Sequence, residues 1–184
     1  MSADDLKMTG YARGATWDRA AARGLAFRPI EADDLPFLAR VYASTRWQEL
    51  APLPWTEAQK SAFLQSQFEA QHAHYQSHYP GALWLVIDCG SQPIGRLYLD
   101  RWQKEHRLID IAVLPEYRGQ GYGTALLRDL IDEAGAAGKP LSIHVERNNP
   151  AMTLYRRLGF CQVGEHGIYD LLEVRSAGVQ ANTA

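Results

Sequence analysis

A strand, three closely spaced glycines and a helix follow one another in the middle of the chain, and this run constrains the fold most. Residues 108–113 are nearly all apolar, which predicts a buried strand. Gly119, Gly121 and Gly123 then precede an amphipathic helical pattern over residues 124–137. Glycines let a ligand approach the backbone, and the free N–H groups of a helix N-terminus attract anions. The run therefore predicts a phosphate-binding turn.

The spacing of the glycines argues against two common nucleotide-binding turns. A P-loop ends in Gly-Lys-Ser or Gly-Lys-Thr, and the sequence holds no such tripeptide. A dinucleotide-binding turn would place its third glycine at Thr124. The series Arg118-x-x-Gly121-x-Gly123 instead resembles the acetyl-CoA signature of the GNAT superfamily of N-acetyltransferases. Taken alone, this series is also compatible with an ordinary glycine-rich turn.

A second stretch, over residues 144–160, strengthens the resemblance. It is similar to the second cofactor motif of the same family and reads Asn148-x-x-Ala151-x-x-Leu154-Tyr155-x-x-x-Gly159-Phe160. The pattern Phe27-Arg-Pro29 followed by Asp34-Leu35-Pro36 is also common in that family. The resemblance covers about residues 25–174, so residues 1–24 fall outside it.

Hydrophobic periodicity predicts one α/β domain over residues 25–175. The predicted strands are 25–30, 83–88, 93–102, 107–113, 141–145, 160–163 and 167–174, and the predicted helices are 35–45, 56–79, 124–137 and 150–158. Asp33 or Asp34 is expected to cap the first helix, and Thr56 the second. The helix 124–137 predicts a right-handed crossover between two parallel strands. The resemblance implies a GNAT fold, with a mixed central sheet of six to seven strands, splayed between the fourth and fifth and flanked by about four helices. We expect residues 1–24 to form a flexible extension with a short helical turn near 17–22, and residues 176–184 a frayed tail.

Composition and charge narrow the function classes. The 184 residues carry a net charge of −2 and no basic block, which argues against nucleic acid as a partner. No apolar run approaches the roughly 20 residues of a membrane span, and the first residues lack the apolar core of a secretory signal. Cys89 and Cys161 are too few and too far apart for a disulfide framework or a zinc site. His74 and His78 could share a metal, but a solvated helix end is the favoured interpretation.

We therefore expect a cytoplasmic protein with no metal, no nucleic acid and no membrane among its partners. Homodimers are common in such folds, but no sequence feature indicates a surface for one.

The resemblance implies an acetyl-CoA site along the splay. The edge formed by Ile111, Ala112 and Val113 would pair with the pantetheine arm, and the Val113 N–H would polarise the thioester carbonyl. The pyrophosphate would bind Arg118 and the turn amides. The turn residues are Gly119, Gln120, Gly121, Tyr122, Gly123 and Thr124. Asn148 would bind across the splay, and Ala151 would leave room for the cofactor.

The same resemblance assigns Tyr155 as the proton donor to the leaving thiolate. A phenol with a pKa of about 10 is protonated at neutral pH, and a thiol has a pKa of about 8.5, so the transfer is nearly balanced. The alternative is that Tyr155 only packs as a helix aromatic. The general base stays open among a water chain and the side chains of Asp110, His144, Glu146, Glu105 and His106.

The acceptor pocket is expected to form from the two N-terminal helices and the loop that connects them. Its candidate lining residues are Arg46, Trp47, Glu49, Trp55, Tyr98 and Tyr169, although the aromatic ones could equally be core. They select no amine, so peptide N-termini, lysine, polyamines, aminoglycosides and amino acids all stay open. No plausible cysteine nucleophile stands beside the motifs, which argues against a covalent acetyl-enzyme. We thus expect an enzyme that acetylates a primary amine of a small molecule or peptide by direct attack in a ternary complex. The alternatives are a non-catalytic acyl-CoA sensor, an acyltransferase for longer acyl chains, and a structural domain.

Overall fold

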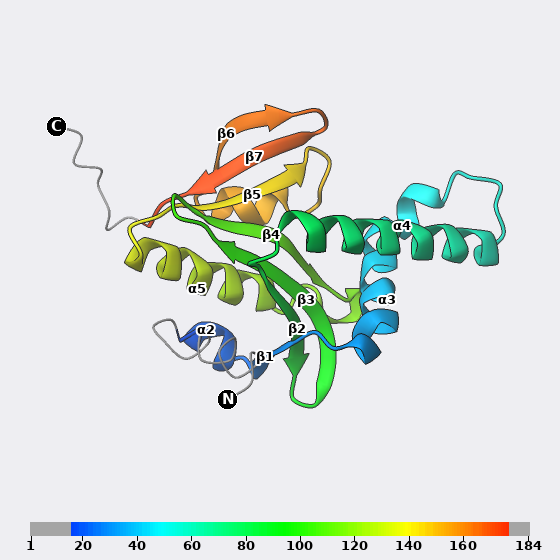
Figure 1. The fold of residues 1–184 in the computed structure, drawn as a ribbon, viewed down its shortest axis with the longest axis horizontal. Coiled ribbons are helices and arrows are strands. Elements are labelled where there is room, and N and C mark those ends of the chain that lie inside the picture. Colours follow the sequence, from blue (N-terminus) through cyan, green and yellow to red (C-terminus); the bar gives the residue numbers. More distant parts are fainter. Residues whose placement is uncertain (1–15, 177–184) are drawn as a thin grey trace.

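A seven-stranded mixed sheet forms the centre of the computed structural model, which describes residues 16–176 (Figure 1). The strand order is β1-β2-β3-β4-β5-β7-β6. β4 and β5 are parallel, and every other neighbouring pair is antiparallel. The strands are β1 (Leu25–Pro29), β2 (Leu83–Cys89), β3 (Gln92–Arg101), β4 (His106–Val113), β5 (Leu141–Glu146), β6 (Cys161–His166) and β7 (Tyr169–Val174). The predicted mixed sheet and its parallel pair are confirmed.

Helices cover both faces of the sheet. They are α2 (Asp18–Ala21), α3 (Leu35–Arg46), α4 (Glu57–His78), α5 (Tyr122–Ala136) and α6 (Met152–Arg157), with short 3-10 turns η1 (Ala32–Asp34), η2 (Trp47–Leu50) and η3 (Pro115–Tyr117). Neighbouring strand residues point to opposite faces. Leu97 of β3 accordingly packs in the same cluster as Leu126 of α5. The guanidinium of Arg96 lies instead over the rings of Tyr42 in α3 and Phe68 in α4.

Two predicted helix caps have different outcomes. The Thr56 hydroxyl accepts a hydrogen bond from the Gln59 N–H and caps α4, as predicted. Asp34 occupies the N-cap position of α3 but makes no side-chain capping hydrogen bond there, because its carboxylate accepts the Glu31 N–H at 2.8 Å and pairs with Arg28 at 2.7 Å. Asp34 therefore closes the η1 turn in front of α3. None of the helices within residues 16–176 has the length and apolar composition that crossing a membrane would require.

The parallel strands β4 and β5 separate after a short paired stretch, which confirms the predicted splay between the fourth and fifth strands. Only His106–Leu108 of β4 pairs with Leu141–Ile143 of β5. A register shift against β3 leaves Ile109 without a partner in that strand, at the point where the separation starts. Such a bulge bends its strand and increases the local twist. The remainder of β4 therefore presents an open edge toward β5.

Residues 16–24, which were expected to belong to a flexible extension, pack on the domain. The Asp129 carboxylate of α5 accepts the Ala20 N–H at 2.8 Å and the Arg19 N–H at 3.3 Å, at the start of α2. The Trp17 indole donates to Glu133 of α5 at 2.8 Å. The predicted helical turn is present, and it is held by side chains from a distant element, which a local sequence pattern does not reveal. Residues 1–15 and 177–184 lie outside the described residues, and with them most of the predicted extension and tail.

Gly95→Ala is expected to destabilise the fold where β3 meets β4. A Cβ at position 95 would lie 2.3 Å from the Ala112 carbonyl oxygen and 3.1 Å from the Val113 Cα. Both are backbone atoms, so a strand has to shift, and overpacking of this kind costs about 1–3 kcal/mol. Urea unfolding would measure the loss. Gly164→Ala is the matched strand control, since its nearest neighbour is a Leu171 side-chain atom at 3.6 Å. Equal midpoints for the two variants would contradict the prediction.

Candidate active site

A cavity of about 130 Å³ lies where β4 and β5 separate. Its walls come from the two strand edges, from α3 and α4, and from the segment that contains α6. The lining side chains outside β4 and β5 are Tyr42, Thr45, Arg46, Gln71, Tyr75, Arg96, Asn149 and Tyr155. The cavity therefore joins the open edge of β4 to a polar surface built by the N-terminal helices.

Backbone groups on the open edge of β4 point into this gap. The Leu114 N–H donates to the Ile94 carbonyl at 2.8 Å, on the side of β3. Because backbone groups alternate sides along a strand, the N–H groups of Val113 and Ile111 point the opposite way, beyond the stretch that pairs with β5. The edge can thus pair with an extended ligand and donate a hydrogen bond to an oxygen.

The glycine turn is shaped as an anion cradle. Gly119 and Gly121 have φ angles of +76° and +83°, a region that glycine adopts readily. Gly121 is the N-cap of α5, and no side chain accepts a hydrogen bond from the first N–H groups of that helix at the cap. These donors and the helix dipole match a phosphate group. The turn therefore fits the pyrophosphate site that was predicted for it.

Arg118 lies in a different place from the one expected. Its Nε donates to the Val113 carbonyl at 2.8 Å, and its Nη2 donates to the Ser44 hydroxyl at 3.1 Å. The side chain thus ties the end of β4 to α3 instead of reaching over the glycine turn. A spacing motif fixes where the backbone lies, but the direction of a long side chain depends on the acceptors that tertiary packing brings near it.

Tyr155 is one of the residues that line the cavity. Its side chain packs edge-to-face on Phe160, and the residue is 4% exposed. Burial, with a smaller contribution from the negative charge of Asp110, raises the pKa of Tyr155. The phenol is therefore protonated at neutral pH and can donate a hydrogen bond into the cavity.

Comparisons with known proteins agree with the site geometry described above. Residues 45–160 match the model of the acetyltransferase (GNAT) family. The chain belongs to this family. It is an acyltransferase of that fold, as the sequence resemblance predicted.

The names of relatives of this GNAT chain state different acetylated substrates. It is 32% identical over 133 residues to the [ribosomal protein bS18]-alanine N-acetyltransferase of Escherichia coli strain K12, covering 71% of this chain and 77% of that protein. It is 24% identical over 151 residues to the spermidine N(1)-acetyltransferase of the same strain, covering 79% and 77%. A solved structure of similar fold is the PaiA N-acetyltransferase of Thermoplasma acidophilum in complex with coenzyme A. It has a TM-score of 0.62 and 18% identity, and covers 83% of this chain and 99% of that chain.

A buried ion pair forms one wall of the cavity in this GNAT domain. Arg96 is 3% exposed, and its Nη2 lies 2.5 Å from Asp110 Oδ2 and 3.3 Å from Gln71 Oε1. The guanidinium is surrounded by the rings of Tyr42, Phe68 and Tyr98. Asp110, predicted as a catalytic candidate, therefore balances a buried positive charge.

The two histidines among the candidate bases of the GNAT site differ in their contacts, since His144 has a close partner and His106 Nδ1 has no hydrogen-bond partner among the described residues. His144 Nδ1 lies 2.7 Å from Arg107 Nη1. Arginine can only donate, so Nδ1 accepts and the neutral ring carries its proton on Nε2. Partial burial, followed by the charge of Arg107, lowers the pKa of His144. His106 is 4% exposed, and burial lowers its pKa too.

The two glutamates among these candidates are paired with arginines. Glu105 accepts from Arg107 at 2.7 Å. Glu146 receives both ends of the Arg46 guanidinium at 2.5 and 2.9 Å, and it also accepts the Tyr169 hydroxyl at 3.2 Å. The hydrogen bonds from Arg46 lower the pKa of Glu146. Both carboxylates are thus engaged as acceptors before any substrate arrives.

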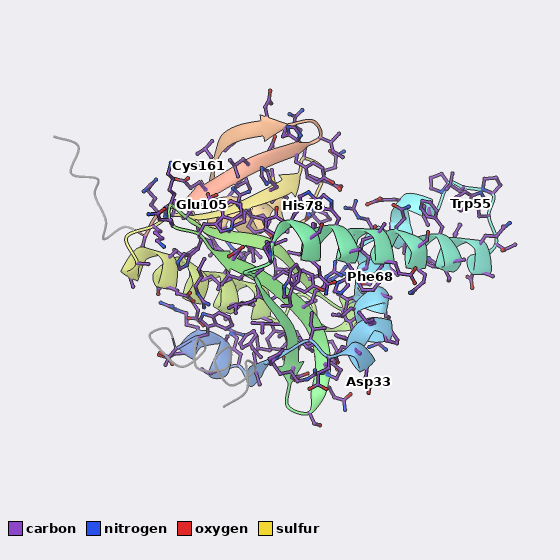
Figure 2. All side chains as sticks on the ribbon, in the orientation of Figure 1. Asp33, Trp55, Phe68, His78, Glu105 and Cys161 are labelled. Carbon is purple, nitrogen blue, oxygen red and sulfur yellow. The ribbon has the colours of Figure 1, made fainter. Side chains whose placement is uncertain are left out.

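The predicted acceptor residues are only partly brought together. Arg46 lines the cavity, while Glu49 is exposed beside it and pairs with Arg46 at 3.0 Å. Trp55 lies at the far end of α4, away from the sheet, and stacks edge-on with Phe63 (Figure 2). Tyr98 is 1% exposed and belongs to the core. The cavity thus contacts both N-terminal helices, and of these four predicted acceptor residues only Arg46 lines it.

Asn149, and not the predicted Asn148, lines the cavity. Asn148 is exposed in the turn after β5, whereas the Asn149 side chain accepts the Ala151 N–H at 2.8 Å in front of α6. Other lining residues missed by the sequence analysis have helical spacing, namely Tyr42 and Thr45 on α3 and Gln71 and Tyr75 on α4. That spacing was the available signal.

The histidines at the end of α4 show no metal-site geometry. The rings of His74 and His78 lie 3.9 Å apart, and His78 Nδ1 lies 2.8 Å from the His74 carbonyl oxygen. Within residues 16–176, no group of three or more His, Cys, Asp or Glu side chains is arranged to hold a metal ion.

Proposed function

We propose that this chain transfers the acetyl group of acetyl-CoA to a primary amine by direct attack in a ternary complex. The observation that carries the proposal is the open β4 edge, which lines the cavity together with Tyr155 and is followed in the chain by the glycine turn. Acetyl-CoA would supply an activated acyl thioester. The chain itself would supply binding, charge stabilisation and a proton.

Each of these features has a defined role in the proposed reaction. The Val113 N–H would donate to the carbonyl oxygen as negative charge develops on it. The N–H groups of the glycine turn would hold the pyrophosphate. Tyr155 would donate its proton to the leaving sulfur. The raised pKa keeps the Tyr155 phenol protonated until the sulfur becomes negative, and it makes full proton transfer less balanced than the sequence indicated.

Direct transfer is favoured by the positions of the two cysteines. Cys161 is exposed on β6, and Cys89 Sγ lies 3.5 Å from the Tyr122 hydroxyl. Neither is among the residues that line the cavity. A covalent acetyl-enzyme would need a nucleophile at the reacting carbon, so the amine itself is the nucleophile in this proposal.

We propose that water removes the proton from the amine. Asp110, Glu105 and Glu146 are paired with arginines, and the acceptor nitrogen of His144 faces Arg107. A polar cavity of about 130 Å³ has room for several water molecules. The pH–rate profiles of the alanine variants at these four positions are therefore expected to keep the acidic limb of the native enzyme. A variant that moves this limb would identify a dedicated base.

The charges of the cavity favour an acceptor with a single amine. Asp110 and Glu146 are already neutralised by Arg96 and Arg46, so they offer little attraction to a second or third ammonium group. Thr45, Gln71 and Tyr75 are polar and uncharged, and can hydrogen-bond an amide. A peptide N-terminus meets both conditions and a small monoamine meets the first, whereas a polyamine meets neither.

Thiol release from acetyl-CoA, measured with a panel of acceptors, tests the proposal. We expect release with peptides that have a free N-terminus or with small monoamines, and little release with spermidine. The same peptides with a blocked N-terminus are the matched control. Release with spermidine alone would contradict the acceptor class. Tight binding of acetyl-CoA without release, across the whole panel, would favour a sensor over an enzyme.

A further inference from the structure

The segment in front of β1 places a cation over the glycine turn. Arg23 Nη1 donates to the Gln120 carbonyl at 2.8 Å. The guanidinium atoms Nη1, Cζ and Nη2 lie 2.8, 3.1 and 3.3 Å from the position that a Cβ on Gly121 would occupy. The guanidinium therefore lies directly against the residue that caps α5, and the absence of a side chain there makes this contact sterically allowed.

The position of Arg23 is fixed by the packing of α2 on α5. The Asp129 carboxylate, whose side chain is 2% exposed, accepts backbone N–H groups at the start of α2. Trp17 donates to Glu133 and packs edge-to-face on Phe27, with ring centroids 4.6 Å apart. These contacts hold α2, and with it Arg23, against the same helix whose N-terminus forms the turn.

The charge at the turn depends on this residue. Arg118, the cation of the sequence motif, is engaged at the Val113 carbonyl and the Ser44 hydroxyl. Arg23 is an exposed arginine whose hydrogen bond to Gln120 uses Nη1. Its other N–H donors have no acceptor among the residues that the structure describes. An arginine can present two parallel N–H donors to a phosphate, which makes the contact strong and directional.

We propose that Arg23 binds a phosphate group of acetyl-CoA. The segment 17–24 would then belong to the cofactor site, and the domain would begin at or before Trp17. This inference rests on the proposed function, because it takes the ligand of the glycine turn to be acetyl-CoA. It adds a residue that lies outside both cofactor motifs. It also couples the packing of α2 to the affinity for the cofactor.

Calorimetric titration of acetyl-CoA into the native protein and the Arg23→Ala variant tests the inference. Loss of one charge-assisted contact is expected to weaken the Kd by about 10- to 100-fold. Arg40→Ala, which removes the same charge from an exposed site on α3, is the control and is expected to leave the Kd unchanged. Arg23→Lys keeps the charge without the planar pair of donors, and is expected to fall between the two.

An acetyl donor without phosphate groups distinguishes phosphate binding by Arg23 from a purely structural role of this residue. Acetylpantetheine has the same thioester and no phosphate group, so its KM is expected to be the same for the native enzyme and Arg23→Ala. Equal weakening with both donors would mean that Arg23 supports the pantetheine site or the fold as a whole instead of binding a phosphate group, and would overturn the inference. An unchanged Kd for acetyl-CoA in Arg23→Ala would overturn it too. Failure of the native protein to bind acetyl-CoA would instead reject the proposed function.

Discussion

Tyr155→Phe is expected to lower kcat by about 10²- to 10⁴-fold, the usual contribution of a positioned general acid. The Kd for acetyl-CoA should change by less than about threefold, because the hydroxyl acts on charge that develops only in the transition state. The phenyl ring keeps the packing on Phe160. Steady-state kinetics and calorimetric titration of the same preparation would separate the two effects.

Tyr98→Phe is the matched control for this prediction. Tyr98 is also a buried tyrosine, 1% exposed, and burial raises its pKa to about 12. It lies outside the set of residues that line the cavity. We therefore expect the control to keep the native kcat. If Tyr155→Phe retained native turnover, Tyr155 would be a packing residue and have no part in the reaction.

Asp110→Ala is expected to cost about 3 kcal/mol of unfolding free energy, toward the lower end of the range for breaking a buried ion pair. The substitution leaves the Arg96 guanidinium, 3% exposed, without its counterion. The lower end is expected because the Asp110 side chain is 20% exposed, which lets water reach the site. Urea denaturation at neutral pH would measure the loss.

Two further variants test the physical cause of this loss. Glu146→Ala breaks the other ion pair of the cavity, whose side chains are 26% and 23% exposed, and should cost only about 1 kcal/mol. The double variant Arg96→Met with Asp110→Leu removes both charges and should be more stable than Asp110→Ala. A loss below about 1 kcal/mol in Asp110→Ala would mean that Arg96 does not depend on its partner.

Features that depend on local sequence could be predicted from the sequence alone. The strands follow from apolar periodicity, the Thr56 cap from its side chain, and the glycine turn from residues that adopt positive φ readily. The splay followed from the family resemblance. Its physical signature, the unpaired Ile109, depends on the register between β3 and β4.

Features determined by tertiary packing could not be predicted in this way. The side of the cavity away from the β4 and β5 edges combines Tyr42, Gln71 and Arg96, which come from three elements. Their polar character was visible, but their convergence depends on how α3 and α4 cross the sheet. The anchoring of α2 depends in the same way on Asp129, more than 100 positions further along the chain. Side-chain partners of this kind have no local pattern.

Backbone amide NMR spectra recorded during a titration with acetyl-CoA test the central claim most directly. We expect the largest shifts at Ile111 and Val113 on the open edge, at the glycine turn over residues 119–124, and around Tyr155. We expect small shifts in β6 and in the first turns of α4. Binding that leaves Ile111, Val113 and the glycine turn unperturbed, or no binding at all, would contradict this account of the site.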